Sequence, residues 1–168
     1  TEFNKSMSGV SAVAGATAAE LDLLREAALR AGADTVFSAS QASQAEAELA
    51  KAGVSVSDIL GGALAGSLGL AAAGQIDLAQ AAEISAQALN IFGLAGDQTT
   101  RVADVLAAGA NKSAADVAQL GDALRQGGLL AAQTGLTLEE TAGVLSLFAD
   151  NALIGSDAGT SLKTVLQR

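Results

Sequence analysis

The chain has 168 residues, of which half are hydrophobic, and its 18 acidic and 9 basic side chains give a net charge of −9. It contains no histidine, cysteine, tryptophan, tyrosine or proline. These absences exclude disulfides, thiol nucleophiles and Cys-ligated metals, and they remove the usual general base. The acidic balance argues against binding to nucleic-acid phosphates and to acidic membrane surfaces. We therefore expect no catalytic centre, no cofactor, no metal site and no direct nucleic-acid binding.

The first sixteen residues are small and polar, and they are predicted to form a linker or loop, or the end of a preceding helix. The pattern Thr17–Glu20 is a capping box, in which a threonine hydroxyl and a glutamate three residues later satisfy each other's backbone amides. It predicts a helix that ends near Gly32. Residues 17–168 are expected to form one helical module. Because the chain starts without methionine, we expect it to be a fragment of something longer.

Glycines at recurring intervals are predicted to end the successive helices. Each follows a run rich in alanine and leucine, and a residue able to cap the next helix comes within a few positions. A glycine just beyond a helix adopts the left-handed conformation without steric cost. The glycines expected at such positions are Gly32, Gly53, Gly74, Gly93, Gly135 and Gly155.

Capping residues also predict where the later helices start. The pair Gly127–Gly128 is expected to break or kink the helix before it. Alternating strand patterns and hairpin turns are nearly absent. The sequence predicts an all-α fold, an array of about seven to nine short helices joined by Gly-containing turns. The expected helix starts are Thr17, Ser38, Ser55 or Ser57, Asp77, Asp97, Ser113, Thr137 and Asp157.

Large apolar side chains are few, because much of the hydrophobic content is alanine. Alanine favours helices but buries little area, so we expect closely approaching helices around a thin core. The residues expected to face inward at helical spacing are Leu78, Leu89, Phe92, Leu145 and Phe148.

The run 59–76 carries no charge and contains a G-x-x-x-G pattern from Gly62 to Gly66. One interpretation is a membrane span with a close-packing face. The other is a helix buried on all sides of a soluble array. Basic and aromatic anchors are missing from the flanks, which favours the buried helix.

Two groups of carboxylates resemble catalytic pairs: the adjacent Glu139 and Glu140, and the near-neighbours Glu46 and Glu48. A carboxylate-based hydrolase is therefore a weak third hypothesis. Most acidic residues lie in predicted first turns, where they interact favourably with the helix dipole, and this favours a structural role. Arg101 lies in a first turn, where a cation is unfavourable, so it is expected to contact an acid elsewhere or to face a partner.

Several segments, in this order along the chain, resemble the core region of bacteriophage tail tape measure proteins. The similarity extends from about Met7 to Arg168, and the ordered series is more specific than any single segment. The segments are Ala31–Ser40, Glu48–Gly53, Asn90–Leu94, Arg101–Ala107, Thr134–Thr141 and Gly155–Leu162.

The resemblance implies a structural protein without a catalytic motif in this region. Tape measure proteins are long helical chains held in several copies in the growing tail tube, and their length sets the tube length. The implied partners are tail tube proteins, tail tip or baseplate proteins, assembly chaperones and further copies of the chain. The implied location is the virion tail, in the tube lumen or at the tip end. A ruler needs long uninterrupted helices, so this interrupted segment resembles a folded module of the ruler protein.

Exposed apolar residues are expected to make the contacts with partners. The candidates are Leu64 and Leu68 in the glycine-rich run, and Leu162, Val165 and Leu166 in the final helix. The alternative function is a membrane-active helical module that inserts run 59–76 into the host membrane during DNA ejection.

Overall fold

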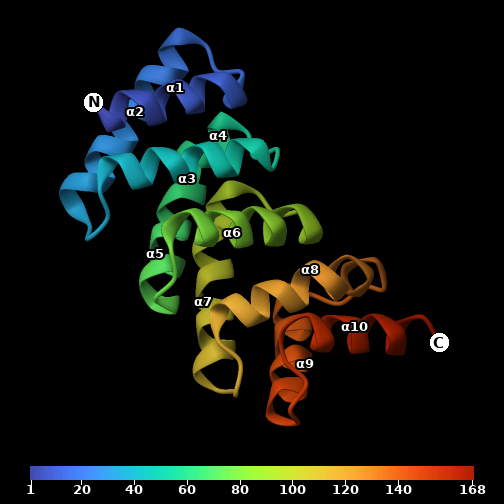
Figure 1. Ribbon diagram of the computed structural model, residues 1–168. Coiled ribbons are helices and arrows are strands. Elements are labelled where there is room, and N and C mark those ends of the chain that lie inside the picture. Colours follow the sequence, from blue (N-terminus) through green and yellow to red (C-terminus); the bar gives the residue numbers. More distant parts are fainter.

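A computed structural model describes residues 1–168, and the chain is helical throughout, without strands (Figure 1). It has nine helices when the continuous segment α4–η1–α5 is counted as one, which confirms the predicted all-α array. The elements are α1 (Glu2–Ala14), α2 (Ala18–Asp34), α3 (Ala39–Lys51), α4 (Val56–Asp58), the π-helical turn η1 (Ile59–Ala63), α5 (Leu64–Gly74), α6 (Leu78–Phe92), the 3₁₀ turn η2 (Gly96–Gln98), α7 (Thr99–Asn111), α8 (Val117–Gln133), α9 (Leu138–Asp150) and α10 (Gly155–Leu166).

The N-terminal segment differs from its prediction as a loop or linker, because residues 2–14 form the helix α1. The hydroxyl of Thr1 caps this helix by accepting a hydrogen bond from the Asn4 amide. Met7 and Val10 lie three residues apart on one face and are buried, and α1 packs against α3. The small polar residues around them conceal this short apolar face in the sequence.

The chain from α3 onward repeats a pair of helices. The residues that precede α3, α6 and α8 are Ser38, Asp77 and Asp116, each 39 residues after the last. In every repeat the first helix leads through a glycine turn to a second helix, which is α4–α5, α7 or α9. The helix α10 occupies the place of a fourth first helix.

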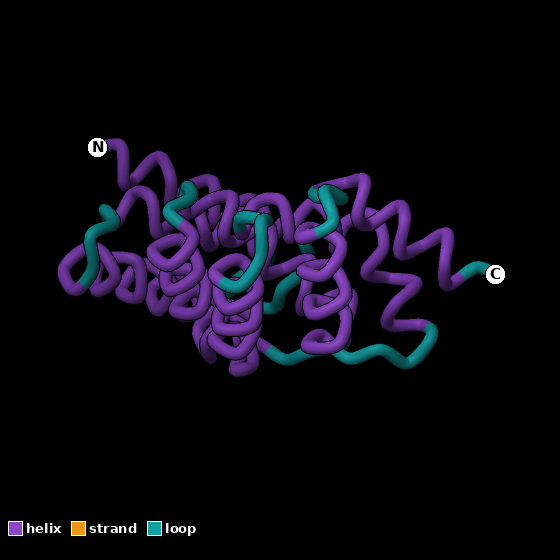
Figure 2. The backbone as a smooth tube through the Cα atoms, turned by 90° about the horizontal axis from the view of Figure 1, so that it is seen from below, coloured by secondary structure: helices purple, strands orange, loops and turns teal.

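We call these units the first repeat (residues 38–76), the second repeat (77–115) and the third repeat (116–154). Figure 1 shows α3, α6, α8 and α10 following one another along the molecule, with α5, α7 and α9 running across them. In the view of Figure 2 the array is elongated, and the two termini lie at its opposite ends. Each repeat packs mainly against its neighbours in sequence, as in helical solenoid proteins.

The three glycine turns inside the repeats share one geometry. Gly53, Gly93 and Gly135 have left-handed backbones, with φ of 88°, 63° and 93°. In each turn the amide one residue further on donates to a carbonyl five residues back, at 2.9–3.0 Å. The prediction that glycine ends helices is therefore confirmed at these positions, and it also holds for the left-handed Gly155.

The same prediction is wrong for Gly32 and Gly74, which lie inside α2 and at the end of α5 with helical backbones. A Cβ on Gly32 would lie 2.6 Å from the backbone nitrogen of Ala39, and one on Gly74 would lie 2.9 Å from the Cβ of Val117. These glycines allow helices to approach closely. The left-handed position after α5 is taken by Gln75 instead.

The predicted break at Gly127–Gly128 is also wrong, because α8 continues through both residues to Gln133. This helix crosses α10 at close range. A Cβ on Gly127 would collide with the carbonyl oxygen of Gly159, and a Cβ on Gly159 would collide with the carbonyl oxygen of Ala123. The small residues are needed for packing and leave the helix uninterrupted.

Substitution of Gly159 by alanine is expected to destabilise the fold by about 1–3 kcal/mol, because its Cβ would meet backbone atoms that cannot rotate away. The matched control is Gly143→Ala in α9, where the added Cβ would have open space around it. There the higher helix propensity of alanine should stabilise the chain by about 0.5–1 kcal/mol. Urea unfolding of both variants tests this opposite sign, and stabilisation by Gly159→Ala would contradict the close crossing.

Most predicted helix starts are confirmed, with capping at Thr17, Ser38, Ser55 and Thr137. Three starts are displaced. A 3₁₀ turn contains Asp97, so α7 begins at Thr99, and α10 begins at Gly155. The sixth predicted helix begins at Val117, because the Asp116 carboxylate accepts from the Gln119 amide at 2.7 Å while the Gln119 side chain accepts from the Asp116 amide at 2.9 Å.

A single hydrophobic cluster runs through the array and is rich in alanine, as the composition predicts. Leu78, Leu89 and Leu145 are buried in it. Phe92 and Phe148 are only partly buried at its edge, so the expectation that they fill the core is wrong. Alanine and leucine fill the space between the closely packed helices, and the two rings cover its margin.

Candidate functional site

The first carboxylate group does not form a catalytic pair. Both oxygens of Glu139 accept hydrogen bonds from Arg101, from Nε at 2.6 Å and from an Nη at 2.8 Å. The hydrogen bonds from this guanidinium lower the pKa of Glu139. Arg101 thus contacts an acid in another helix, which is one of the two alternatives predicted for it. Glu139 is consumed by an ion pair between the second and third repeats.

The neighbouring acids Glu140 and Glu48 also have structural roles. The Glu140 carboxylate accepts from the Thr137 amide at 2.8 Å, and the Thr137 hydroxyl accepts from the Glu140 amide at 3.1 Å. Glu48 forms an exposed ion pair with Lys51 at 2.8 Å. The helix-end interpretation of these residues therefore agrees with their positions. The chain contains no cluster of three or more side chains suited to hold a metal ion.

Glu46 is the unusual acid of this chain, and sequence reasoning did not distinguish it from Glu48. Its side chain is fully buried in α3, and neither carboxylate oxygen has a hydrogen-bond partner. Burial raises the pKa of Glu46 from 4.5 to about 8. The signal in the sequence is its spacing, because Ala42 and Leu49, four residues before and three after it, lie on the same buried face.

Two of the five predicted contact residues are not free to meet a partner. Leu162 and Leu64 are only 3% and 6% exposed, because α10 packs on α8 and α5 packs on α6 and α7. Val165 is 63% exposed, and Leu68 and Leu166 are half-buried. The two groups lie in different parts of the array, with Leu64 and Leu68 in the first repeat and the others in α10. They do not form one surface.

A shallow apolar groove of about 310 Å³ lies where α2 meets η1 and α5. Leu60 is partly exposed there, and Leu68 and Leu64 line the wall. The sequence did not predict this groove because α2 and α5 are distant in the chain.

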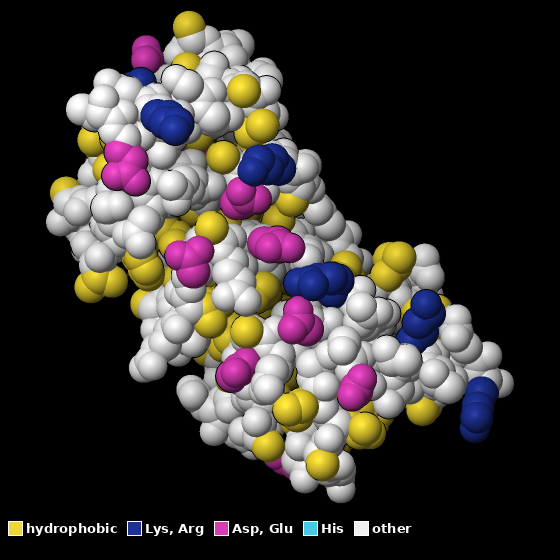
Figure 3. Space-filling view, in the orientation of Figure 1, with side chains coloured by type: hydrophobic (Ala, Val, Ile, Leu, Met, Phe, Trp, Pro, Cys, Tyr) yellow, Lys and Arg dark blue, Asp and Glu magenta, His cyan; other side chains and the backbone are white.

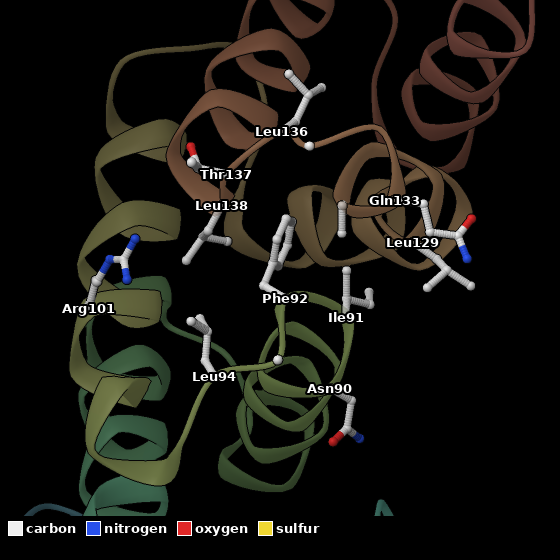
Figure 4. A pocket seen from close by; sticks show the side chains of 13 residues that line it. Asn90, Ile91, Phe92, Leu94, Arg101, Leu129, Gln133, Leu136, Thr137 and Leu138 are labelled. Carbon is white, nitrogen blue, oxygen red and sulfur yellow. The ribbon is translucent and has the colours of Figure 1, made fainter.

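A larger groove of about 520 Å³ lies between the second and third repeats (Figure 4). Its walls come from the turn after α6 and from the turn between α8 and α9. Figure 4 shows Phe92 and Leu138 pointing towards each other across this space, with Arg101 to one side. The lining residues are Asn90, Ile91, Phe92, Gly93, Leu94, Arg101, Leu129, Ala132, Gln133, Gly135, Leu136, Thr137 and Leu138.

Charged side chains are scattered over the face shown in Figure 3, with hydrophobic side chains between them and no large patch of one sign. The exposed large hydrophobic residues are spread over the array in the same way. They are Val13, Leu23, Leu29, Val36, Leu60, Leu129, Leu147, Leu153, Ile154 and Val165.

The uncharged run 59–76 lies in one kinked helix, Val56–Gly74, which is long and apolar enough to cross a membrane by length and composition alone. Less than half of this helix is buried, so the expectation of burial on all sides is wrong. Gly62 forms the kink with φ of 155°. A Cβ on Gly66 would lie 2.6 Å from the backbone of Thr99, so this glycine serves the contact between α5 and α7.

Comparison with known proteins places these features in a family. Residues 25–168 match the family described as phage-related minor tail protein. The chain is 41% identical over 167 residues to the tape measure protein of Pneumococcus phage Dp-1, covering 99% of the chain and 14% of that protein. It is 34% identical over 169 residues to the probable tape measure protein of Escherichia phage P2, covering 99% of the chain and 21% of that protein.

The chain therefore spans a fifth or less of the length of these two relatives. No solved structure matches it significantly. The family match covers most of the chain and includes all three repeats, and the relatives align along nearly its whole length. This protein belongs to the phage-related minor tail proteins of the tape measure type, and its role is a structural one in the phage tail.

Proposed function

We propose that this chain is a packing module of a tape measure protein, which acts in tail assembly, in tail length determination and in DNA delivery through contacts between helix faces. The observation that supports this most directly is the combination of its kinship with an open array of helix pairs. An array of this kind offers a long surface in proportion to its core, which suits simultaneous contact with several partners. The proposed partners are tail tube, tip or baseplate proteins, assembly chaperones and further copies.

The exposed side chain of Val165 on α10 is the best remaining candidate for such a contact. Replacing Val165 by glutamate should leave the helical content intact, because the side chain points away from the core. It should reduce the yield of infectious particles strongly, because a charge would enter an apolar contact. The measurement is a plaque titre from phage that carry the variant, with tails counted by electron microscopy.

The matched control is Thr164→Glu, which adds the same charge at the neighbouring exposed position without removing an apolar side chain. It should give near-normal titres. Equal titres for the two variants and the parent phage would reject Val165 as a contact.

The second candidate function is insertion into the host membrane, and the apolar helix Val56–Gly74 is the feature that favours it. Insertion would have to break the contact of Gly66 with Thr99 and expose the polar ends of α7. In a liposome flotation assay, the folded chain should remain unbound if it is a packing module. Flotation together with the vesicles would favour the membrane function instead.

A further inference from the structure

The two junctions between successive repeats are closed in different ways. At the junction of the first and second repeats, the Asn90 side-chain amide donates to the Ala52 carbonyl at 2.8 Å. Nearby, the Gly96 amide donates to the Asp58 carboxylate at 2.7 Å. These two polar bridges join the glycine turn of one repeat to the turn of the next.

The glycine turns allow the same positions to be found at the junction of the second and third repeats. Asn90 lies three residues before Gly93, and the residue three before Gly135 is Ala132. An alanine has no amide to donate, so the first bridge is absent. The position of Ala52, directly before its glycine, is taken by Phe92.

The second bridge is also missing at this junction. Asp58 lies five residues after its turn glycine, and the equivalent residue after Gly93 is Gln98. The Gln98 side chain accepts a hydrogen bond from Arg101 at 3.3 Å. The groove of about 520 Å³ lies where these bridges would be, with Ala132 and Phe92 in its wall.

The ion pair of Arg101 and Glu139 spans the edge of this groove between α7 and α9. Both side chains are about half exposed, so the pair is weak and is screened by salt. Other contacts at the junction are tight. A Cβ on Gly121 would lie 2.8 Å from the Ile84 side chain, and the Ala114 amide donates to the Asp150 carboxylate at 3.1 Å.

We propose that the array bends at the junction between its second and third repeats, and that the Arg101–Glu139 ion pair is the latch that holds this hinge closed. The contact of α6 with α8 is the pivot, and opening widens the groove beside Phe92. The junction between the first and second repeats, with its two polar bridges, is the rigid one. This inference does not depend on the proposed function.

The experiment measures distances between spin labels across each junction by pulsed electron resonance. Because the chain has no cysteine, each introduced pair is labelled uniquely. The test pair is Asp104→Cys with Gly143→Cys, on α7 and α9. The control pair is Gly69→Cys with Ala108→Cys, on α5 and α7. All four positions are exposed, and the second residue of each pair lies 39 residues after the first.

Raising the salt concentration should broaden the distance distribution of the test pair and shift it to longer distances, while the control pair stays unchanged. Arg101→Ala should produce the broad distribution already at low salt. The exchange Arg101→Glu with Glu139→Arg should restore the narrow one. These results would support the latch. Distributions of equal width in both pairs, insensitive to salt and to Arg101→Ala, would overturn it.

A separate variant tests the hinge without touching the ion pair. Ala132→Asn places an amide at the position that Asn90 holds in the preceding repeat, and it should narrow the test-pair distribution at high salt. An unchanged broad distribution in a folded Ala132→Asn variant would contradict the missing bridge as the cause of the bend. Circular dichroism of each labelled protein confirms that the array is folded.

Discussion

Replacement of Glu46 by glutamine is expected to raise the free energy of unfolding at pH 8 by several kcal/mol. The carboxylate is fully buried without a hydrogen-bond partner, and its pKa is raised from 4.5 to about 8 in the folded chain. An ionised carboxylate is favoured in the unfolded chain, where water solvates it, so ionisation drains stability from the fold. Glutamine has nearly the same shape and carries no charge.

The sign of the pH dependence follows from the raised pKa. The contribution of the neutral Glu46 to stability is fully present below pH 4.5 and is lost as the pH rises to about 8. Within this window the unfolding free energy should fall by about 1.4 kcal/mol per pH unit, which is a large share of a typical total. Urea titrations at several pH values between about 5 and 8 measure this slope.

Glu46→Gln should remove most of the slope. The control Glu48→Gln changes an exposed acid of the same helix that pairs with Lys51, and it should leave the slope in place. A parent chain whose stability is constant over this pH range would show that Glu46 is solvated or paired in solution.

Leu145→Ala is expected to destabilise the chain by about 2–5 kcal/mol, measured by urea unfolding. Leu145 is buried in α9, in a core where alanine supplies much of the packing and few large side chains can move into a cavity. The control Leu147→Ala lies two residues away in the same helix, with a side chain that is mostly exposed. It should cost no more than about 0.5 kcal/mol.

Similar losses for Leu145→Ala and Leu147→Ala would mean that α9 is rotated relative to the arrangement described here. Phe148 provides an intermediate case. Its ring is only partly buried, so Phe148→Ala should cost less than the 3–5 kcal/mol typical of a fully buried phenylalanine.

Helix starts were largely predictable from the sequence because capping is a local interaction. Thr17, Ser38 and Thr137 each bond to a residue three positions later, so the partners are adjacent in the sequence as well as in space. The start at Asp116 was missed although its capping partner, Gln119, is equally local. Ser113 offered an earlier cap, and its hydroxyl instead accepts from the Ala115 amide in the turn before α8.

The repeat length was not predictable from glycine spacing because glycine serves two purposes in this chain. Gly32, Gly53 and Gly74 are evenly spaced by 21 residues, yet only Gly53 forms a turn. The other two admit a neighbouring helix, and a packing glycine is recognised only from the atoms that approach it. The period of 39 residues becomes visible when the packing glycines are set aside.

The site features that sequence reasoning missed depend on contacts between distant segments. The large groove is formed by the ends of four helices, and the burial of Glu46 depends on the helices that enclose α3. The bond between Arg101 and Glu139 joins residues 38 positions apart, and only an unfavourable position for Arg101 hinted at it. The exposure of Val165 and the burial of Leu162 follow from how α10 crosses α8.

The period of 39 residues has a consequence for how proteins of this kind can change in length. Residues 77–115 begin and end at equivalent points of the repeat, so their removal would join Ile76 to Asp116 in the register that now joins Ala115 to it. Duplication of the same segment would extend the array by one helix pair without altering its two ends. Insertions or deletions of other sizes would place a first helix where a second one packs. Gene length in this region can therefore change in whole steps with least damage to the fold.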